Sequence, residues 1–236
     1  MDISAFEGEV CRGAFSLHIE GMFGPGIHLI TGMTGSGKTT LAETLIGNIS
    51  PKFGTIRYNG IKSMMLSMQS AERHVTTPTV STEIASFGAD RKTVLSRADL
   101  NGFENRRILS LSRGELKKLI LMCILSTHFD LLVLDEPYAG LDCAAKQKIS
   151  DAISDSCSDI CIILTHDLSF LPPVDYLWEI EHNTLTFLGL VPDALHSWKM
   201  APEPVTYLLS HGIVPANIDQ KTLMEAACRI RESGQG

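Results

Sequence analysis

The most informative stretch of this 236-residue sequence reads Gly32-Met33-Thr34-Gly35-Ser36-Gly37-Lys38-Thr39 and satisfies the pattern GxxxxGK[ST]. The mostly apolar residues 27–31 before it predict a short strand, and residues 40–49 after it carry apolar side chains near helical spacing. Between a strand and a helix, glycines allow backbone N–H groups and the helix N-terminus to face one anion. The stretch therefore predicts a loop that binds the phosphates of a nucleotide.

The polar side chains of this loop have distinct expected roles. Lys38 is expected to neutralise the β and γ phosphates, and Thr39 is expected to give its hydroxyl to Mg²⁺. The predicted nucleotide-binding residues of the loop are Gly32, Thr34, Gly35, Ser36, Gly37, Lys38, Thr39 and Thr40. An ordinary glycine turn is the alternative interpretation, and the flanking strand and helix argue against it.

A second motif lies in residues 131–136, where an unbroken apolar run ends in Asp135 and Glu136. Such a run predicts a strand buried in a parallel sheet. Because alternation along a strand sends neighbouring side chains in different directions, the two carboxylates can do two jobs. Asp135 suits the Mg²⁺ shell, and Glu136 suits polarising or deprotonating the attacking water. A core strand that ends in solvated acids is the alternative interpretation.

The rest of the chain alternates strand and helix patterns, which predicts an α/β fold with a parallel sheet. Residues 15–19 alternate apolar and polar side chains and predict an antiparallel edge strand. The other expected strands are 55–58, 63–68, 160–165, 177–180 and 184–188, and the other expected helices are 116–125, 146–154, 205–211 and 220–231. Residues 69–110 are polar and helix-compatible, and they indicate an inserted subdomain.

Composition excludes several classes of protein. With 20 basic and 27 acidic residues the net charge is −7, which argues against binding nucleic acid by bulk charge. No apolar run approaches the roughly 18 to 20 residues that a membrane-spanning helix needs. The N-terminus lacks the pattern of a secretory signal, so a cytoplasmic location is expected. The six cysteines contain no CxxC pair, which predicts reduced thiols rather than disulfides or a zinc site.

A third motif, Leu111-Ser112-Arg113-Gly114-Glu115, precedes the carboxylate strand by one helix and resembles the signature sequence of ABC-type ATPases. The usual family form is LSGGQ, so this chain departs at Arg113 and Glu115 and keeps Ser112 and Gly114. In that family the signature faces the γ-phosphate bound on the opposite subunit. A carboxylate near a triphosphate is repelled, so the side chain of Glu115 is expected to point away, or the site is weakened.

Further matches to the family follow in chain order. Gln69 is similar to the Q-loop glutamine, Gly140-Leu141-Asp142 to the D-loop at the dimer interface, and Thr165-His166-Asp167 to the segment with the switch histidine. Phe6 lies where the family often has an aromatic residue that stacks on adenine, although a buried strand phenylalanine is the alternative. The resemblance covers about residues 1–192.

The resemblance implies a P-loop NTPase of the ABC ATPase type, with a parallel sheet core, an antiparallel β edge subdomain and a short helical insertion. Residues 1–195 are expected to form the ATPase domain, with a helical subdomain at about 70–125, and residues 196–236 a C-terminal helical extension. The implied ligands are ATP and Mg²⁺. The implied catalytic residues are Glu136, His166 and Gln69, the implied metal ligands are Thr39, Gln69 and Asp135, and Phe6, Ser112, Gly114 and Asp142 join the loop residues in binding nucleotide.

Residues 69–88 and 201–227 are similar to segments of the ATPases of energy-coupling-factor importers, which bring vitamins, cobalt and nickel into prokaryotic cells. This likeness implies an ATP-hydrolysing importer subunit at the cytoplasmic face of the membrane. Its expected partners are integral membrane components and a second ATPase subunit, either identical or a paralogue.

Two other functions are considered. One is a nucleotide-responsive module with slow or no turnover, as a regulatory protein or the degenerate half of a heterodimer, and the altered signature leaves room for it. The other is a nucleic-acid protein, which is disfavoured because the chain lacks a long coiled-coil insertion or a second ATPase cassette.

Overall fold

The computed structural model describes residues 1–13, 15–156 and 158–233, without the side chains of residues 4–7 and 230–233. The strands are β1 (Asp2–Arg12), β2 (Phe15–Phe23), β3 (Gly26–Gly32), β4 (Phe53–Asn59), β5 (Met64–Ser67), β6 (Leu131–Asp135), β7 (Ile160–Leu164), β8 (Tyr176–Glu181) and β9 (Thr184–Leu190). The α-helices are α1 (Lys38–Leu45), α2 (Val80–Ser86), α3 (Arg91–Ala98), α4 (Arg113–Leu125), α5 (Cys143–Ser154), α6 (Glu203–Ser210) and α7 (Gln220–Ser233). Three 3₁₀ turns are η1 (Ala71–His74), η2 (Ile108–Ser110) and η3 (Asp193–His196).

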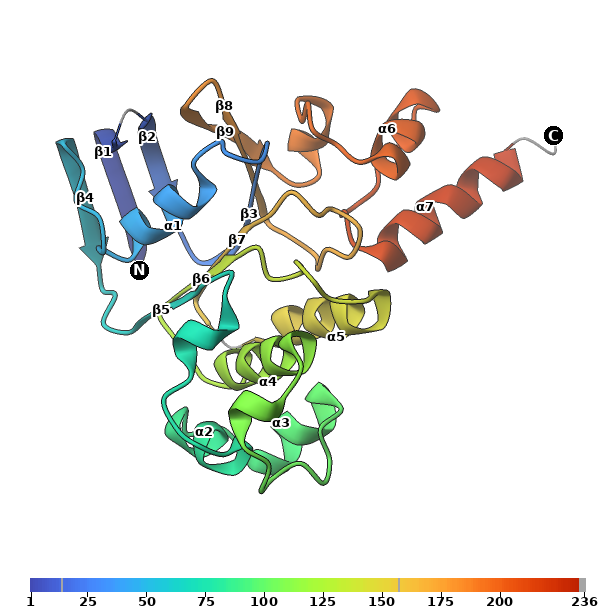
Figure 1. The fold of residues 1–236 in the computed structure, drawn as a ribbon. Helices are drawn as coiled ribbons and strands as arrows, with labels where there is room; N and C mark the ends of the chain where they lie inside the picture. The colour runs from blue at the N-terminus through green and yellow to red at the C-terminus, as the bar shows by residue number, and fades with distance from the viewer. Residues whose placement is uncertain (14, 157, 234–236) are drawn as a thin grey trace.

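A single sheet runs through the molecule in the order β4-β1-β2-β9-β8-β3-β7-β6-β5 (Figure 1). Its centre is parallel, because β3 pairs with both β7 and β8, and β6 pairs with both β5 and β7. Every residue of β6 and β7 is buried, as their unbroken apolar sequences predict. The carboxyl ends of β3, β6 and β7 therefore meet at one edge of the sheet.

The other part of the sheet is antiparallel. β1 pairs antiparallel with β2 and β4, and β8 pairs antiparallel with β9. The predicted α/β fold with a parallel core and an antiparallel β edge is thus confirmed. β1 lies where no strand is predicted, because a register shift between Ala5 and Gly8 interrupts the alternation that would mark it.

Helices cover both faces of the parallel core (Figure 1). Alternate residues of each strand face opposite ways: Leu29 and Leu132 belong to one buried cluster with α4 and α5, whereas Ile30 and Val133 belong to another with α1. The sheet is thus the middle layer of a three-layer arrangement, and the ends of its strands are free to carry a site.

The polar stretch after β5 forms short helices whose starts are fixed by capping side chains. Thr79 caps α2 in a capping box with Thr82, and Asp90 caps α3 through the N–H of Thr93. In Figure 1 these two helices lie beside α4, away from the sheet. They form the region in which the helical insertion is expected.

Side-chain hydrogen bonds attach the C-terminal segment to the core before α7. Trp198 Nε1 donates to Thr31 Oγ1 at 3.1 Å, and Asn217 exchanges two hydrogen bonds of 2.9 Å with the backbone of Val174. Helix α7 then projects from the body of the protein (Figure 1). Across residues 1–13, 15–156 and 158–233, no helix combines the length and the apolarity that crossing a membrane requires.

Candidate active site

The loop between β3 and α1 depends on the small size and positive φ angles of its glycines. Gly35 has φ +83° and Gly37 has φ +103°, in the region that favours glycine. A Cβ atom on Gly32 would lie 2.6 Å from Ser36 Oγ, and one on Gly37 would lie 2.6 Å from Phe15 Cζ. The loop therefore leads directly into α1, whose first N–H groups have no partner within the helix.

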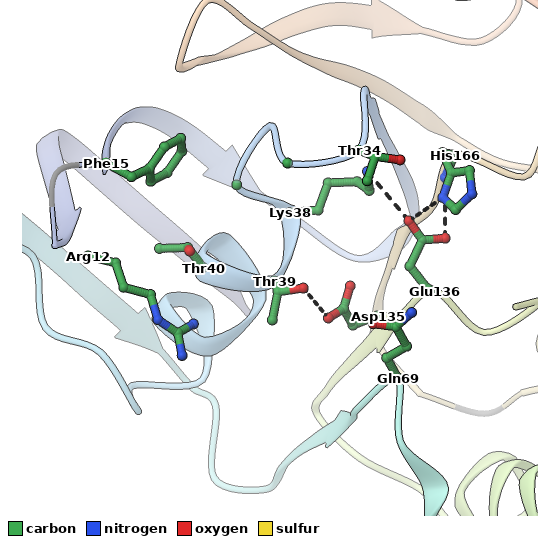
Figure 2. A pocket seen from close by; sticks show the side chains of 12 residues that line it. Arg12, Phe15, Thr34, Lys38, Thr39, Thr40, Gln69, Asp135, Glu136 and His166 are labelled. Carbon is green, nitrogen blue, oxygen red and sulfur yellow. Dashed lines mark hydrogen bonds and ion pairs between the residues drawn. The ribbon is translucent and has the colours of Figure 1, made fainter.

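A cavity of about 400 Å³ opens beside this loop. Its lining residues come from β1, β2, the loop, α1 and the ends of β5, β6 and β7 (Figure 2), and they are Arg12, Phe15, Thr34, Gly35, Gly37, Lys38, Thr39, Thr40, Gln69, Asp135, Glu136 and His166. The structure thus brings together all three predicted catalytic residues, all three predicted metal ligands and most of the predicted loop residues.

Lys38 is the buried cation of the cavity. Its Nζ donates to the carbonyl oxygens of Gly32 at 2.8 Å and Met33 at 3.2 Å, and it lies 3.4 Å from Glu136 Oε1. Only 6% of the residue is exposed. The ammonium is therefore fixed at the mouth of α1, where phosphate oxygens would bind.

Buried Asp135 and exposed Thr39 form a pair of oxygen ligands. Thr39 Oγ1 donates to Asp135 Oδ2 at 2.7 Å, while Asp135 Oδ1 is buried and has no hydrogen-bond partner among the described residues. Burial is the main cause that raises the pKa of Asp135, and the hydrogen bond from Thr39 opposes it. Hard oxygen ligands with one unsatisfied buried acceptor suit Mg²⁺. The residues present therefore fit this ion.

Glu136 has φ +51°, so the backbone leaves β6 through the left-handed region. Glu136 Oε2 accepts from Thr165 Oγ1 at 3.0 Å, and Oε1 lies 2.7 Å from His166 Nδ1 (Figure 2). The carboxylates of Asp135 and Glu136 are thus directed to different partners. Their divergence comes from this turn of the backbone, and not from alternation along a strand as expected.

Besides Phe6, five predicted site residues do not line the cavity. Ser112 and Asp142 cap the N-termini of α4 and α5, and Gly114 lies in the first turn of α4. Ser36 belongs to the loop, but its buried Oγ has no hydrogen-bond partner among the described residues. Gly32 is the last residue of β3 and supplies a carbonyl to Lys38 rather than a lining surface.

The prediction for Phe6 cannot be followed to its side chain, which lies outside the described residues. Its backbone pairs with Thr55 in the middle of β1. The aromatic ring that lines the cavity is instead that of Phe15, on the opposite side of Lys38 from His166 (Figure 2). Phe15 is not among the predicted site residues, because it also begins an alternating strand. Its position at the start of that strand, before the loop in the chain, is the signal that could have identified it.

Arg12 is the second lining residue without a sequence prediction. Its Nη1 donates to Glu43 Oε2 at 3.0 Å, which ties the end of β1 to α1. Arg12 and Phe15 together form the side of the cavity farthest from the carboxylates of Asp135 and Glu136 (Figure 2).

The signature-like residues form a capping box at the start of α4. Ser112 N donates to Glu115 Oε2 at 2.7 Å, and Glu115 N donates to Ser112 Oγ at 3.3 Å. The hydrogen bond from the Ser112 N–H is the main cause that lowers the pKa of Glu115. The carboxylate of Glu115 therefore folds back onto its own helix start.

Comparisons with known proteins identify the family of the chain. Residues 25–139 match the family model described as ABC transporter. The chain is 32% identical over 192 residues to an ABC transporter ATP-binding protein of Pyrococcus horikoshii, and the match covers 71% of this chain and 74% of that protein. It is 28% identical over 184 residues to an energy-coupling factor transporter ATP-binding protein of Thermotoga maritima, with 69% of this chain and 71% of the relative covered.

Among solved structures, the chain superimposes on that of a cobalt transport ATP-binding protein with a TM-score of 0.64. The match has 23% sequence identity and covers 79% of this chain and 80% of the other, so it bears on the fold. The phosphate-binding loop, the paired carboxylates and the relatives of similar length agree: the chain belongs to the ABC transporter ATP-binding proteins, a family of ATPases.

Proposed function

We propose that this chain is the ATP-hydrolysing subunit of a membrane importer of the energy-coupling-factor type. The energy-coupling-factor type is supported by the Thermotoga maritima relative, which is named as an energy-coupling factor protein, and by the fold shared with a cobalt transport protein. The hydrolytic role is carried by one observation: Lys38, Asp135 and Glu136 meet in a single cavity with Thr39 and His166.

In this proposal the loop and the first turn of α1 bind the phosphates of ATP. Lys38 donates to the β and γ phosphates from the position that its two carbonyl contacts define. Mg²⁺ would be held by Thr39, Asp135 and Gln69, and it would neutralise charge on the phosphates. Phe15 offers its ring to the base at the far side of the cavity, because an aromatic face stacks on any nucleobase.

Glu136 acts on the attacking water. Its carboxylate is fixed by Thr165 and His166 at 3.0 and 2.7 Å, so it is oriented before the nucleotide arrives. It accepts the water's proton as the oxygen attacks the γ-phosphorus and the bond to ADP breaks. The imidazole of His166 can hydrogen-bond both this carboxylate and the γ-phosphate, which would hold the two reacting groups together.

Two copies, or this chain and a paralogue, would bind two ATP molecules between them. Ser112 and Gly114 lie outside the cavity of their own chain, which is consistent with a role at the partner's nucleotide. Asp142 caps α5 and would lie at the subunit interface. Because both chains would contact each nucleotide, ATP favours the closed dimer, and hydrolysis removes that preference.

The organisation of the chain follows from this role. Residues 1–195 would form the ATPase domain with a helical subdomain at about 70–125, and residues 196–236 a C-terminal extension. Integral membrane components would bind near Gln69 and residues 70–88, which follow β5 directly. The protein would then be peripheral, at the cytoplasmic face of the membrane.

Substitution Glu136→Gln tests the hydrolytic role. It keeps the size of the side chain and removes its basicity, so steady-state hydrolysis should fall by about a thousandfold while ATP binding persists. Size-exclusion chromatography with Mg-ATP should show dimers that retain ATP. The matched control is Glu72→Gln, an exposed glutamate outside the cavity. Unchanged hydrolysis in Glu136→Gln would contradict the role of this residue.

A second candidate is a nucleotide-responsive module with slow turnover. It is favoured by the departures of the signature, since Arg113 and the carboxylate of Glu115 stand where the family has Gly and Gln. The wild-type hydrolysis rate separates the two: a rate no higher than that of Glu136→Gln supports the module.

A further inference from the structure

Lys117 connects the signature helix to the turn that carries the catalytic carboxylate. It lies on α4, five residues after Ser112, and is 7% exposed. Its Nζ donates to the carbonyl oxygen of Glu136 at 2.8 Å and to that of Ala139 at 2.9 Å. No sequence pattern singles out this lysine, since a lysine in a helix usually lies on the solvated face.

Burying the ammonium group of Lys117 costs free energy, and an apolar side chain could fill the same space without that cost. Burial is the main cause that lowers the pKa of Lys117 to about 8, and the charges of Glu136 and Asp135 oppose that shift. Both of these acceptors are main-chain carbonyls of one turn, so the ammonium holds the backbone between Glu136 and Ala139. A charged donor makes such hydrogen bonds stronger than a neutral one would.

The backbone at Glu136 needs this support. A non-glycine residue with φ +51° is held in a costly conformation that persists only when its surroundings determine it. The N–H of Glu136 donates to Leu164 O at 2.8 Å, and its carbonyl oxygen accepts from Lys117 Nζ at 2.8 Å and from the N–H of Ala139 at 3.3 Å. Without Lys117, only the longer bond from Ala139 would hold the peptide after Glu136, and the carboxylate would be less firmly aligned with His166.

Lys117 also lies about 7.5 Å along the helix axis from Ser112, by the rise of 1.5 Å per residue. The start of α4 is the part that, in the proposed function, reaches the nucleotide of the partner. We propose that Lys117 is a positioning residue that fixes the carboxylate of Glu136 relative to the signature helix, and so couples contact with the partner's nucleotide to chemistry in the chain's own site. This inference rests on the proposed function.

The test compares Lys117→Met and Lys117→Gln with wild type. Methionine keeps the apolar stem and removes the donors, whereas glutamine keeps a neutral N–H donor. Lys117→Met should lower kcat by about twentyfold or more, with KM and the dissociation constant of a fluorescent ATP analogue within about twofold. Lys117→Gln should recover part of kcat. Lys117→Met should still form dimers with Mg-ATP, as Glu136→Gln does.

Lys118→Met is the matched control, because it removes the neighbouring cation. Lys118 Nζ lies 3.6 Å from Asp99 Oδ2, and neither residue lines the cavity. Its kcat should stay within about twofold of wild type. Circular dichroism checks folding, and Lys117→Gln carries the test if Lys117→Met does not fold. Unchanged kcat in the Lys117 variants overturns the inference, and so does a parallel loss of ATP binding, dimer and turnover, which indicates a purely structural role.

Glu136→Gln in the same preparations separates the two proposals. If Glu136→Gln abolishes hydrolysis and the Lys117 variants do not reduce it, only the inference on Lys117 fails. If Glu136→Gln hydrolyses ATP at the wild-type rate, the proposed role of Glu136 fails, and the positioning role fails with it.

Discussion

His28 is a buried histidine in the strand that leads into the phosphate-binding loop, and both of its ring nitrogens are paired. Trp178 Nε1 donates to Nδ1 at 3.1 Å, so Nε2 carries the proton and donates to Gly24 O at 2.8 Å. Desolvation by burial lowers the pKa of His28 to about 4. A second proton on this ring would leave the Trp178 N–H without its acceptor.

Acidification should therefore destabilise the protein through His28. Since the folded-state pKa lies below the unfolded value, the unfolded chain binds the proton first as the pH falls, and the free energy of unfolding decreases between pH 6.5 and about 4. The decrease in the free energy of unfolding should reach about 3 kcal/mol at about pH 4. Urea denaturation at several pH values measures it, and His28→Gln should flatten the slope. His182→Gln, whose ring is exposed, should keep the wild-type slope.

At the scale of elements, the capping box of α4 makes a specific prediction for the signature. Glutamine fits the same capping position as Glu115, so Glu115→Gln should change the free energy of unfolding by less than about 0.5 kcal/mol. It also removes a negative charge from the helix start that would face the partner's phosphates. Formation of the ATP-bound dimer should therefore occur at lower ATP concentration. A weaker dimer would show that the folded-back carboxylate does not oppose phosphate binding.

Glu83 anchors the segment between η1 and α2. The residue is fully buried, and Glu83 Oε2 accepts from the N–H groups of Thr76 at 3.1 Å and Thr77 at 2.8 Å and from Thr77 Oγ1 at 2.7 Å. Glu83→Gln should lower the free energy of unfolding by about 2 to 3 kcal/mol, because charged hydrogen bonds are lost and an amide faces N–H donors. Thermal unfolding measures the change. The exposed Glu72→Gln should differ by less than about 0.5 kcal/mol.

The predictability of each element depends on how its position is determined. Residues 27–31, 131–134 and 160–165 are predicted as strands because burial on both faces leaves mostly or entirely apolar runs. The short helices α2 and α3 are not predicted individually, since caps and tertiary contacts fix them rather than periodicity. A register shift hides β1 in the same way.

The residues of the candidate site also fall into two groups, those that sequence motifs predict and those that depend on the fold. Lys38, Asp135 and His166 follow from motifs at strand ends, and the structure places all three at one cavity. Phe15 and Lys117 do not follow, because their positions depend on how β2 and α4 pack against the loop and the turn. Residues that bind through local motifs are readable from sequence, whereas residues that act across elements need the fold.

At the scale of the whole molecule, the C-terminal segment is part of the core before it projects as α7. Trp198 is 4% exposed and donates to Thr31, at the end of the strand before the loop. Trp198→Ala should lower the free energy of unfolding by about 3 to 5 kcal/mol, through lost packing and an unpaired hydroxyl. Deleting residues 220–236 should lower the free energy of unfolding by less than Trp198→Ala does. Calorimetry on both variants measures the difference, and equal losses would contradict the anchoring role of Trp198.

The sheet order also limits what can move. The loop, the histidine and the paired carboxylates follow β3, β7 and β6, which are direct hydrogen-bonded neighbours. The distances between these groups are thus held by the hydrogen bonds between the three strands, and a conformational change that separates the groups would have to break those bonds. In the proposed function, any movement would therefore occur in the helices around the sheet, while the groups at these three strand ends would keep their positions relative to one another.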